Sequence, residues 1–424
     1  MKSCELKNLI KNGGLKKYEA LYRSIDEQSK RFLAAIESFE EIFGKDRDVE
    51  IFSVPGRSEI CGNHTDHNHG KVLAGAINRD IIAVAAKNDL GVIRLQSEGY
   101  GMSEIHLDKV SNSKNFRRFT STALIAGVCN GFVKNGYAIG GYDAYTTTEV
   151  LKGSGISSSA AFEVMIGNIL NYTYNDGKIS KEESAKISQY SENEYFGKPC
   201  GLMDQMACAI GGFVYIDFEK PSDPVILPID FSLTSNGYSL CIVNTGGNHA
   251  NLNDDYASVP AEMLAVAREM GAENLRGVTR EKLIASIPAV RKKLGDRAVL
   301  RSLHFFAENE RVEKAKDALI EGKIDKLLPI ILESGRSSFQ YLQNVYTNIN
   351  VAEQGLSMAL CLTEGYLKDT KCAFRVHGGG FAGTIQVFLP TEYLEEYSKF
   401  MDGIFGNGAA MPLNVRSSGA CKLF

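Results

Sequence analysis

A cluster of glycine and serine residues joins a strand-like segment to a helix-like segment in the first half of the chain. The cluster GSGISSSAA, residues 153–161, follows YDAYTTTEV and precedes the apolar stretch FEVMIGNILNYTYN. The hydrophobic pattern changes there from the period of a strand to that of a helix. Glycine lets the backbone approach a ligand closely, and N–H groups at a helix start favour phosphate. The cluster predicts either a phosphate-binding loop or a flexible turn with a serine N-cap.

Two common nucleotide motifs do not describe this cluster. A Walker A loop is excluded because there is no GxxxxGK[ST], and the GxGxxG spacing of a dinucleotide fingerprint fails at Ser158. The three successive hydroxyls add hydrogen-bond donors and one potential Mg²⁺ ligand. The cluster alone therefore does not decide between the two interpretations.

Strand-like and helix-like segments alternate along the whole chain. Residues 1–45 have apolar positions at helical spacing, and a second long helical region is expected from about residue 260 to 370. The expected strands include VEIFSVPG, KVLAGAINRDIIAVAAKND, GVIRLQSEGY, FVYIDF, SLCIVNTG and the two strands of AFRVHGGGFAGTIQVFLP. This interleaving predicts an α+β architecture with two lobes. We expect an N-terminal lobe over residues 1–225 and a C-terminal lobe over residues 226–424.

Composition excludes several classes of protein. The formal net charge of −4 gives no basic footprint for nucleic acid. No apolar run reaches the roughly 18 residues that span a membrane, and MKSCELKNLIKNGG lacks the apolar core of a signal peptide, so a cytoplasmic location is expected. The nine cysteines are odd in number and form no CxxC pair, which predicts reduced thiols and no structural zinc.

The segment ICGNHTDHNHG, residues 60–70, places three of the seven histidines around one aspartate. Such a run is compatible with a metal site or with recognition of a polar ligand. Zinc is the less favoured interpretation, because no CxxC or HExxH supplies a further ligand group.

Three further segments carry candidate chemistry. In GLMDQ, residues 201–205, Asp204 is either a general base or a helix N-cap. Glu192, on the preceding helix, could reach a metal held by phosphates or could be an exposed helix-face residue. The glycines of HGGGFAG, residues 377–383, permit an unusual hairpin or close approach to a ligand.

The order of these segments resembles the galactokinase family of the GHMP small-molecule kinases. VPGRSEICGNHTDHNHGKVLAGAI resembles the family signature GR-x-N-x-x-G-E-H-x-D-Y, and KGSGISSSAAFEV resembles the ATP-phosphate loop. KPCGLMDQ is similar to the segment of the catalytic base, RVHGGGFAG to the C-terminal glycine motif, and VNTGGNHANLNDDY to the segment that ends in a sugar-contacting tyrosine. The resemblance spans roughly residues 20 to 424. It implies a two-lobed GHMP kinase fold with the active site in the cleft between the lobes.

The resemblance also implies roles for individual residues. Asp204 would take the proton from the anomeric hydroxyl of a galacto-configured sugar, whose oxygen then attacks the γ-phosphoryl group of ATP, and Arg57 would keep Asp204 ionised. The implied sugar contacts are Asn63, His64, Thr65, Asp66, Gly201, Asp204 and Tyr256. The implied ATP contacts are Ser97, Gly153, Ser154, Gly155, Ile156, Ser157, Ser158 and Ser159. Mg²⁺ would be held by Ser159 (Ser158 is the next candidate) and Glu192, in a protein expected to be a monomer.

Departures from the family pattern leave the substrate open. Asn63 stands where the family has a glutamate that faces the C6 hydroxyl of the sugar, GRSE replaces GRVN, and ASVPAEM follows Tyr256 where many members have paired arginines. An amide can accept from a hydroxyl or donate to a carboxylate, so galactose is the favoured substrate and galacturonate the alternative. A sensor that binds sugar and ATP without turnover is less favoured, because the serine run is whole and Asp204, Glu192 and Arg57 are present.

Overall fold

The computed structural model describes residues 1–150, 155–198, 200–247 and 252–424. Its helices are α1 (Ser3–Lys11), α2 (Ile25–Phe43), α3 (Ser121–Lys134), α4 (Ser158–Tyr174), α5 (Lys181–Tyr190), α6 (Met203–Ile210), α7 (Asn253–Glu269), α8 (Arg280–Leu294), α9 (Asp296–Ile320), α10 (Ile324–Ser337), α11 (Gly355–Tyr366) and α12 (Leu394–Phe405). Its strands are β1 (Glu50–Cys61), β2 (Lys71–Lys87), β3 (Val92–Ser97), β4 (Met102–His106), β5 (Tyr142–Thr148), β6 (Phe213–Asp217), β7 (Val225–Ile229), β8 (Tyr238–Asn244), β9 (Ala373–His377), β10 (Thr384–Pro390), β11 (Ala410–Leu413) and β12 (Cys421–Lys422).

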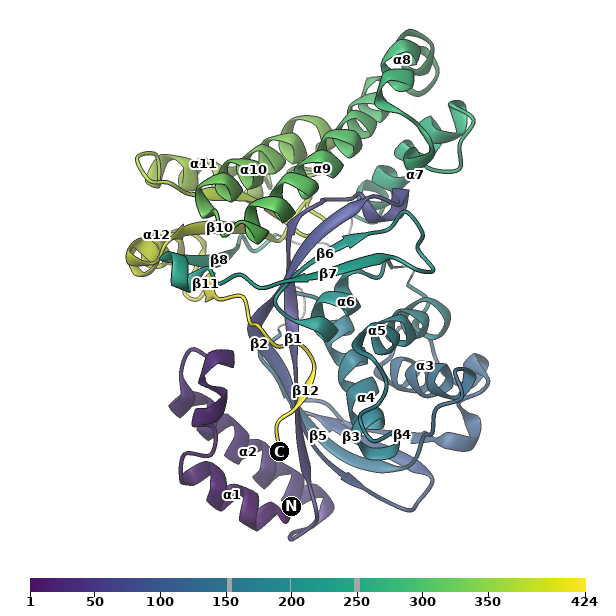
Figure 1. Cartoon of the computed structure of the whole chain (residues 1–424), viewed down its shortest axis with the longest axis vertical. Coiled ribbons are helices and arrows are strands. Elements are labelled where there is room, and N and C mark those ends of the chain that lie inside the picture. The colour runs from purple at the N-terminus through teal and green to yellow at the C-terminus, as the bar shows by residue number, and fades with distance from the viewer. Residues whose placement is uncertain (151–154, 199, 248–251) are drawn as a thin grey trace.

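The first sheet is built around the long antiparallel hairpin of β1 and β2. Its strand order is β12-β1-β2-β5-β3-β4, and β6 pairs with β2 and with β7. Strand β2 is long enough to pair with β5 along its second half and with β6 along its first half. The hairpin therefore runs from the bottom of the lower lobe to the upper lobe, where its tip lies near α7 (Figure 1).

Alternate residues of the hairpin face two different layers of helices. Ile82 and Val84 pack in one core with the apolar stripe of α1 and α2, whereas Ala83 and Ala85 pack in another core with α3 to α6. This alternation follows from the period of two in a strand. Helix α2 supplies its stripe through residues such as Phe32, which are buried at helical spacing.

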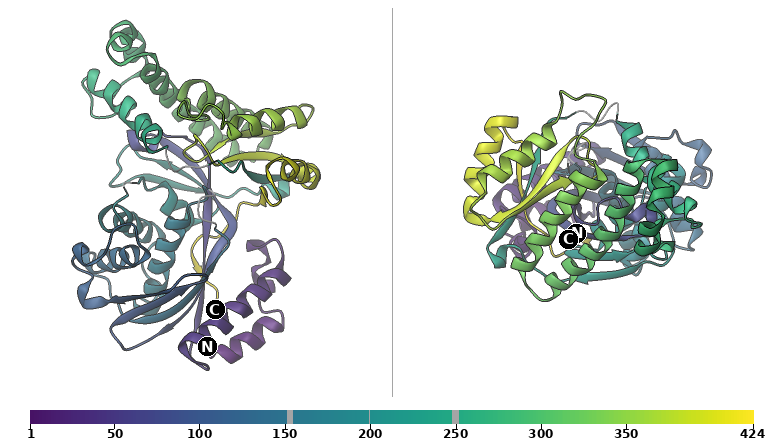
Figure 2. Two further views of the ribbon diagram at one scale, coloured as in Figure 1. Left: turned by 180° about the vertical axis from the view of Figure 1, so that it is seen from behind. Right: turned by 90° about the horizontal axis from the view of Figure 1, so that it is seen from above.

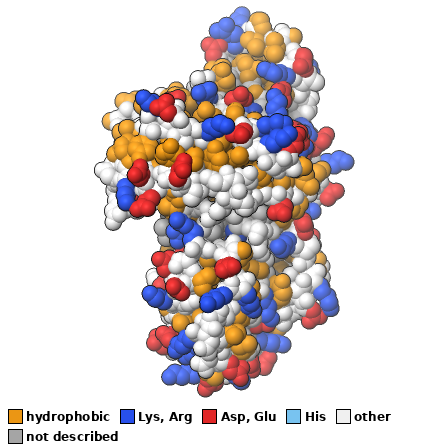
Figure 3. Space-filling model, turned by 60° about the vertical axis from the view of Figure 1, so that its left-hand side comes forward, with side chains coloured by type: hydrophobic (Ala, Val, Ile, Leu, Met, Phe, Trp, Pro, Cys, Tyr) orange, Lys and Arg blue, Asp and Glu red, His pale blue; other side chains and the backbone are white. Residues whose placement is uncertain are grey.

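The second sheet has the strand order β11-β8-β10-β9. Its residues also alternate: Cys241 and Val243 pack with α11 and α12, whereas Leu240 and Ile242 share a core with residues of α9 and α10. Helices α7, α8 and α9 extend beyond this sheet at the top of the molecule (Figures 1 and 2). In Figure 3, a band of hydrophobic side chains crosses the face of this upper lobe.

The predicted α+β architecture with two lobes is confirmed. The exact division at residues 225 and 226 stays a prediction; β7 pairs within the first sheet, and the C-terminal strand β12 returns to the same sheet beside β1. The two termini accordingly lie close together in the lower lobe (Figure 2). Within the described ranges, no helix is both long enough and apolar enough to cross a membrane.

Candidate active site

A cavity of about 280 Å³ lies between the two lobes. The lower lobe contributes Arg57, the loop from Gly155 to Ser159, Lys198 and Asp204, and the upper lobe contributes Tyr256, His377, the glycine turn Gly378–Gly380, Gly383 and Thr384. Most of the segments singled out in the sequence therefore meet at one place, although they lie more than 300 residues apart in the chain.

Arg57 reaches this cavity because β1 is irregular there. The register of β1 against β2 shifts between Pro55 and Arg57, and the Arg57 backbone N–H donates to the Ile156 carbonyl at 3.2 Å. Gly56 permits the close approach, since a Cβ at this position would lie 2.6 Å from the same carbonyl oxygen. The bulge brings the strand against the glycine–serine loop.

Asp204 lies in the first turn of α6, and both of its oxygens accept hydrogen bonds. Arg57 Nε donates to Oδ1 at 2.7 Å, and Ser157 Oγ donates to Oδ2 at 2.5 Å. Burial acts to raise the pKa of Asp204, but the Arg57 guanidinium and the Ser157 hydroxyl outweigh it and hold the pKa below its usual value. The carboxylate keeps 32% of its side-chain surface accessible, so an ionised oxygen faces the cavity.

The described part of the glycine–serine loop lies beside this carboxylate. Arg57 Nη1 donates to the Gly155 carbonyl at 2.7 Å, and Ser157 adopts a left-handed conformation with φ of 62° before α4 begins at Ser158. The expected contacts Gly153 and Ser154 lie outside the described residues. The N-terminus of α4 with its serine hydroxyls opens onto the cavity, an arrangement suited to phosphate.

Glu192 is buried beneath the loop, in a single π-helical turn at Ser191–Phe196. Ser159 Oγ donates to Glu192 Oε1 at 3.1 Å, and Gln205 Nε2 donates to Oε2 at 2.8 Å. A carboxylate and a hydroxyl are the hard oxygen ligands that Mg²⁺ prefers, so this pair fits the ion. A second buried carboxyl, Glu163, accepts from the same Gln205 nitrogen at 3.1 Å, and burial together with Glu192 raises its pKa well above the usual value.

The histidine-rich segment forms the tip of the β1–β2 hairpin, and its three histidines bond to three different partners. His64 Nε2 lies 2.9 Å from the Gly379 carbonyl, His67 Nδ1 lies 3.3 Å from Asp66 Oδ1, and His69 Nδ1 lies 3.2 Å from Asn274 Nδ2. Burial and the neighbouring His67 lower the pKa of His64 to about 4, so its ring is neutral. This geometry suits hydrogen bonding to a ligand better than a shared metal.

Asp66 and Gly201 lie in contact. A Cβ on Gly201 would lie 2.2 Å from Asp66 Oδ2, so only glycine leaves this oxygen free. Burial acts to raise the pKa of Asp66, while hydrogen bonding from His67 lowers it below the usual value. Thr65 shapes the turn by donating to the Gly62 and Lys71 carbonyls at 2.9 and 2.7 Å, and Tyr256 donates to the Gly380 carbonyl at 2.7 Å.

Asn63 points into the protein and is only 1% exposed. Its Nδ2 donates to Glu59 Oε1 at 2.8 Å and to the Gly378 carbonyl at 2.9 Å, while its Oδ1 accepts from Asn344 Nδ2 at 2.7 Å. These protein groups use both amide hydrogens. Asn63 therefore connects the lobes, and its donors are not directed toward the cavity.

Ser97 lies at the end of β3, where its Oγ is 2.8 Å from Thr146 Oγ1. It is not among the described residues that line the cavity. Seven cavity residues were absent from the set of site residues expected from the sequence: Lys198, His377, Gly378, Gly379, Gly380, Gly383 and Thr384. All of them except Thr384 lie inside the KPCGLMDQ and HGGGFAG motifs, and membership of a motif is the one signal that could have identified them.

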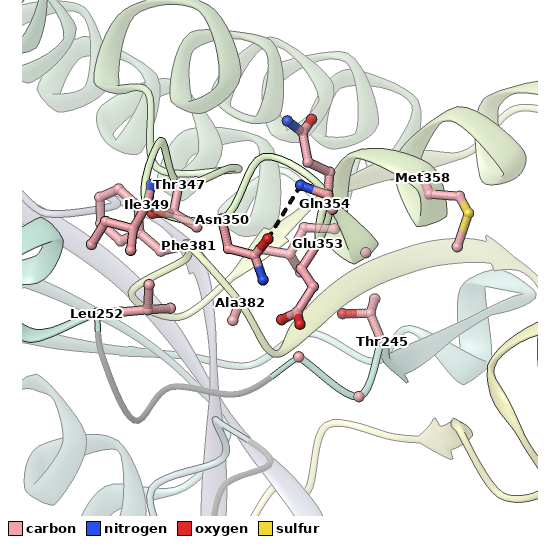
Figure 4. A pocket seen from close by; sticks show the side chains of 15 residues that line it. Thr245, Leu252, Thr347, Ile349, Asn350, Glu353, Gln354, Met358, Phe381 and Ala382 are labelled. Carbon is pink, nitrogen blue, oxygen red and sulfur yellow. Dashed lines mark hydrogen bonds between the residues drawn. The ribbon is translucent and has the colours of Figure 1, made fainter.

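A larger cavity of about 570 Å³ lies on the other side of the glycine turn, between the end of β8 and the start of α11. Figure 4 shows the Glu353 carboxylate and the Thr245 hydroxyl turned toward the same part of it. Phe381 and Ala382, which follow the glycine turn, form its other wall. None of the expected site residues is among its described lining.

Two family models and several characterised proteins match this chain. The galactokinase galactose-binding signature matches residues 37–87, and the GHMP kinases N terminal domain matches residues 123–212. Galactokinase from Glaesserella parasuis is 30% identical over 372 residues, covering 86% of this chain and 91% of that protein. Galactokinase from Streptomyces coelicolor is 29% identical over 374 residues, covering 87% and 92%.

Solved structures share the fold. Lactococcus lactis galactokinase complexed with galactose superposes with a TM-score of 0.76 at 23% identity, covering 91% of this chain and 98% of that one. Methanococcus jannaschii mevalonate kinase superposes with a TM-score of 0.60 at 12% identity, covering 87% and 98%.

The chain has a two-lobed fold, and a glycine–serine loop suited to phosphate borders the cavity between the lobes. Together these features define a GHMP-type small-molecule kinase, a phosphotransferase that uses ATP. Within this class, the chain belongs to the galactokinase family.

Proposed function

We propose that this protein is an ATP-dependent sugar 1-kinase that converts D-galactose to galactose 1-phosphate. One observation carries the proposal: an ionised aspartate, Asp204, is held between Arg57 and Ser157 on the wall of a cavity that the glycine–serine loop and the glycine turn also line. Family membership with galactokinases supports galactose as the sugar.

The residues of the cavity and of the adjoining β1–β2 hairpin tip divide the chemistry between them. Asp204 accepts the proton of the anomeric hydroxyl, and the oxygen so activated attacks the γ-phosphorus of ATP. Arg57 keeps Asp204 ionised and offsets the negative charge that develops on the transferred group. The N–H groups and hydroxyls from Gly155 to Ser159 bind the phosphates, while Asp66, His64 and Tyr256 orient the sugar.

Mg²⁺ is proposed to bind at Ser159 and Glu192, whose oxygens lie 3.1 Å apart. When bound, the ion neutralises phosphate charge. Glu192 is suited to this role because Gln205 fixes its second oxygen, which leaves Oε1 facing the loop. A cytoplasmic location and a monomeric state stay predictions from the sequence.

Asn63 bears on the choice between galactose and galacturonate. Both hydrogens of its amide are used by Glu59 and Gly378, so it has no free donor for a C6 carboxylate. The nearby Arg375 is 0% exposed and lies 3.2 Å from Glu59, so it is not available to such a carboxylate either. These contacts favour the neutral sugar.

The test is an ADP-release assay with Mg-ATP over galactose, galacturonate, N-acetylgalactosamine, glucose and arabinose, with the phosphorylated carbon identified by NMR. Galactose is expected to have the highest kcat/KM and to be phosphorylated at C1. A galacturonate rate more than about tenfold above the galactose rate, equal to about 1.4 kcal/mol of barrier, would replace the substrate. Sugar and ATP binding without ADP release would instead identify a sensor.

A further inference from the structure

Lys198 is a cation of the catalytic cavity that has no role in the scheme above. It follows the π-helical turn at Ser191–Phe196 and a left-handed Gly197, and its backbone N–H donates to the Glu192 carbonyl at 3.2 Å. Its side chain is 59% exposed and lines the cavity together with Asp204. A flexible ammonium group therefore borders the space next to the glycine–serine loop.

The Lys198 ammonium group contacts Glu192 Oε1, the carboxylate oxygen that is the proposed metal ligand. Lys198 Nζ is 3.3 Å from Glu192 Oε1, the same oxygen that accepts from Ser159. The other oxygen, Oε2, is occupied by Gln205. Two cations on one oxygen repel each other, so Lys198 and Mg²⁺ compete for Glu192 Oε1.

An ammonium group displaced from Glu192 can contact either Asp204 or the phosphates of a bound nucleotide, and the phosphates are the better partner. The charge of Asp204 is already compensated by Arg57 at 2.7 Å. The nucleotide phosphates, by contrast, bring negative charge that one divalent ion does not balance. Lysine suits them because its long stem carries a point charge with three donors.

We propose that Lys198 exchanges partners in the reaction cycle, holding Glu192 Oε1 until the magnesium nucleotide binds and then contacting a phosphate oxygen of ATP. The proposal rests on the proposed function, specifically on the metal role of Ser159 and Glu192. Lys198 then adds a second positive charge to that of Arg57 at the transferred phosphoryl group, and it acts as a catalytic residue.

The test compares Lys198→Met, which removes the charge but keeps the length, with Lys198→Arg, which keeps the charge. Lys178→Met is the matched control, because Lys178 forms an exposed ion pair with Asp176 at 2.9 Å and does not line the cavity. Mn²⁺ binding to the nucleotide-free protein is measured by electron paramagnetic resonance, and Mg-ATP binding is measured by calorimetry.

The exchange predicts effects of opposite sign in one variant. Lys198→Met should bind Mn²⁺ about two- to fivefold more tightly, since the competing ammonium is gone. The same variant should bind Mg-ATP about tenfold more weakly and lose about 10- to 100-fold in kcat/KM for ATP, since a charged phosphate contact is lost. Lys198→Arg should stay within about threefold of wild type in kcat/KM. Lys178→Met should match wild type in Mn²⁺ affinity, Mg-ATP affinity and kcat/KM.

A Glu192→Gln variant separates failure of this proposal from failure of the metal site. If Glu192→Gln leaves Mn²⁺ affinity unchanged, the proposed metal site is wrong and the exchange is wrong with it. If Glu192→Gln weakens Mn²⁺ binding but Lys198→Met weakens it too, or leaves Mg-ATP affinity unchanged, then only the exchange is overturned. A wild-type protein that releases no ADP with any sugar would contradict the proposed function itself.

Discussion

Asp204→Asn tests the base role with little change to the packing of the site. The amide keeps an oxygen that can accept from Arg57 Nε, at 2.7 Å in the wild type, and its nitrogen can donate to Ser157 Oγ. What is lost is proton acceptance, and general base catalysis contributes about 10²- to 10⁴-fold. At 1.36 kcal/mol for each factor of ten, the expected rise in the barrier is about 3 to 5 kcal/mol.

The assay is single-turnover formation of sugar phosphate, with ATP affinity measured separately by calorimetry. ATP affinity should stay within a few-fold, because the loop that binds the phosphates is unchanged. Asp217→Asn is the control, since Asp217 also pairs with an arginine, Arg276 at 2.9 Å, but lies outside the cavity. Turnover of Asp204→Asn within tenfold of wild type would refute the reasoning.

The pH dependence gives a second view of the same group. Because the pKa of Asp204 lies below its usual value, the carboxylate is ionised at all pH values well above about 4. Turnover should therefore lose nothing to protonation of Asp204 between about pH 5 and 8. An acid limb that lies in this window and disappears in Asp204→Asn would contradict the pKa direction.

Three further changes test other parts of the structure. Gly201→Ala should raise KM for the sugar at least tenfold and leave ATP affinity unchanged, because the added Cβ would lie 2.2 Å from Asp66 Oδ2. An unchanged KM would remove Asp66 from the sugar site. Burial lowers the pKa of His304 to about 4, so between about pH 6.5 and pH 4 the His304 ring takes up a proton only in the unfolded chain. The free energy of unfolding therefore decreases as the pH is lowered below about 6.5. In urea unfolding at about pH 7.5 and at about pH 5, the wild type should lose about 2 kcal/mol more stability between the two pH values than His304→Gln loses. Equal losses in the two proteins would argue against the lowered pKa of His304. Asp80→Asn should cost about 3 to 5 kcal/mol in the same assay, because the carboxylate is 0% exposed and lies 3.1 Å from an equally buried Arg416, and a cost below about 1 kcal/mol would show the pair to be dispensable.

Local patterns in the sequence predicted the elements, and errors arose where the chain is interrupted. The expected helix over residues 1–45 is divided into α1 and α2, with a turn after Asn12. Gly14 marks this turn, since a Cβ there would lie 2.7 Å from the Leu9 carbonyl oxygen. The glycines of KNGG were a visible signal. The strand β12 had none, because it exists only through its pairing with β1.

The candidate site was likewise predicted in part: motifs identified its residues, but not all of the contacts between them. The resemblance to galactokinases brought Asp204, Arg57 and the glycine–serine loop together in advance, because each lies in a recognisable motif. The contact of Ser157 with the nucleotide stays a prediction, but the hydrogen bond from its hydroxyl to Asp204 Oδ2 was not foreseen. The contact of Lys198 with Glu192 was also not foreseen. Both contacts depend on how α6 and the π-helical turn pack under the loop, which no local pattern encodes.

Position 63 shows why a substitution within a motif must be interpreted together with its neighbours. The family pattern has an amide at the position of Glu59 and a carboxylate at that of Asn63, so this chain carries the two groups in exchanged positions. The groups are in contact, with Asn63 Nδ2 2.8 Å from Glu59 Oε1, so the exchange preserves one carboxylate–amide hydrogen bond. The charge moves to the side where Arg375 lies 3.2 Å away. A glutamate introduced at position 63 alone would bury two carboxylates side by side, whereas the same change combined with Glu59→Asn would preserve the pair. The loss of an acidic residue at position 63 is therefore accounted for by this pairing and does not by itself indicate a different sugar.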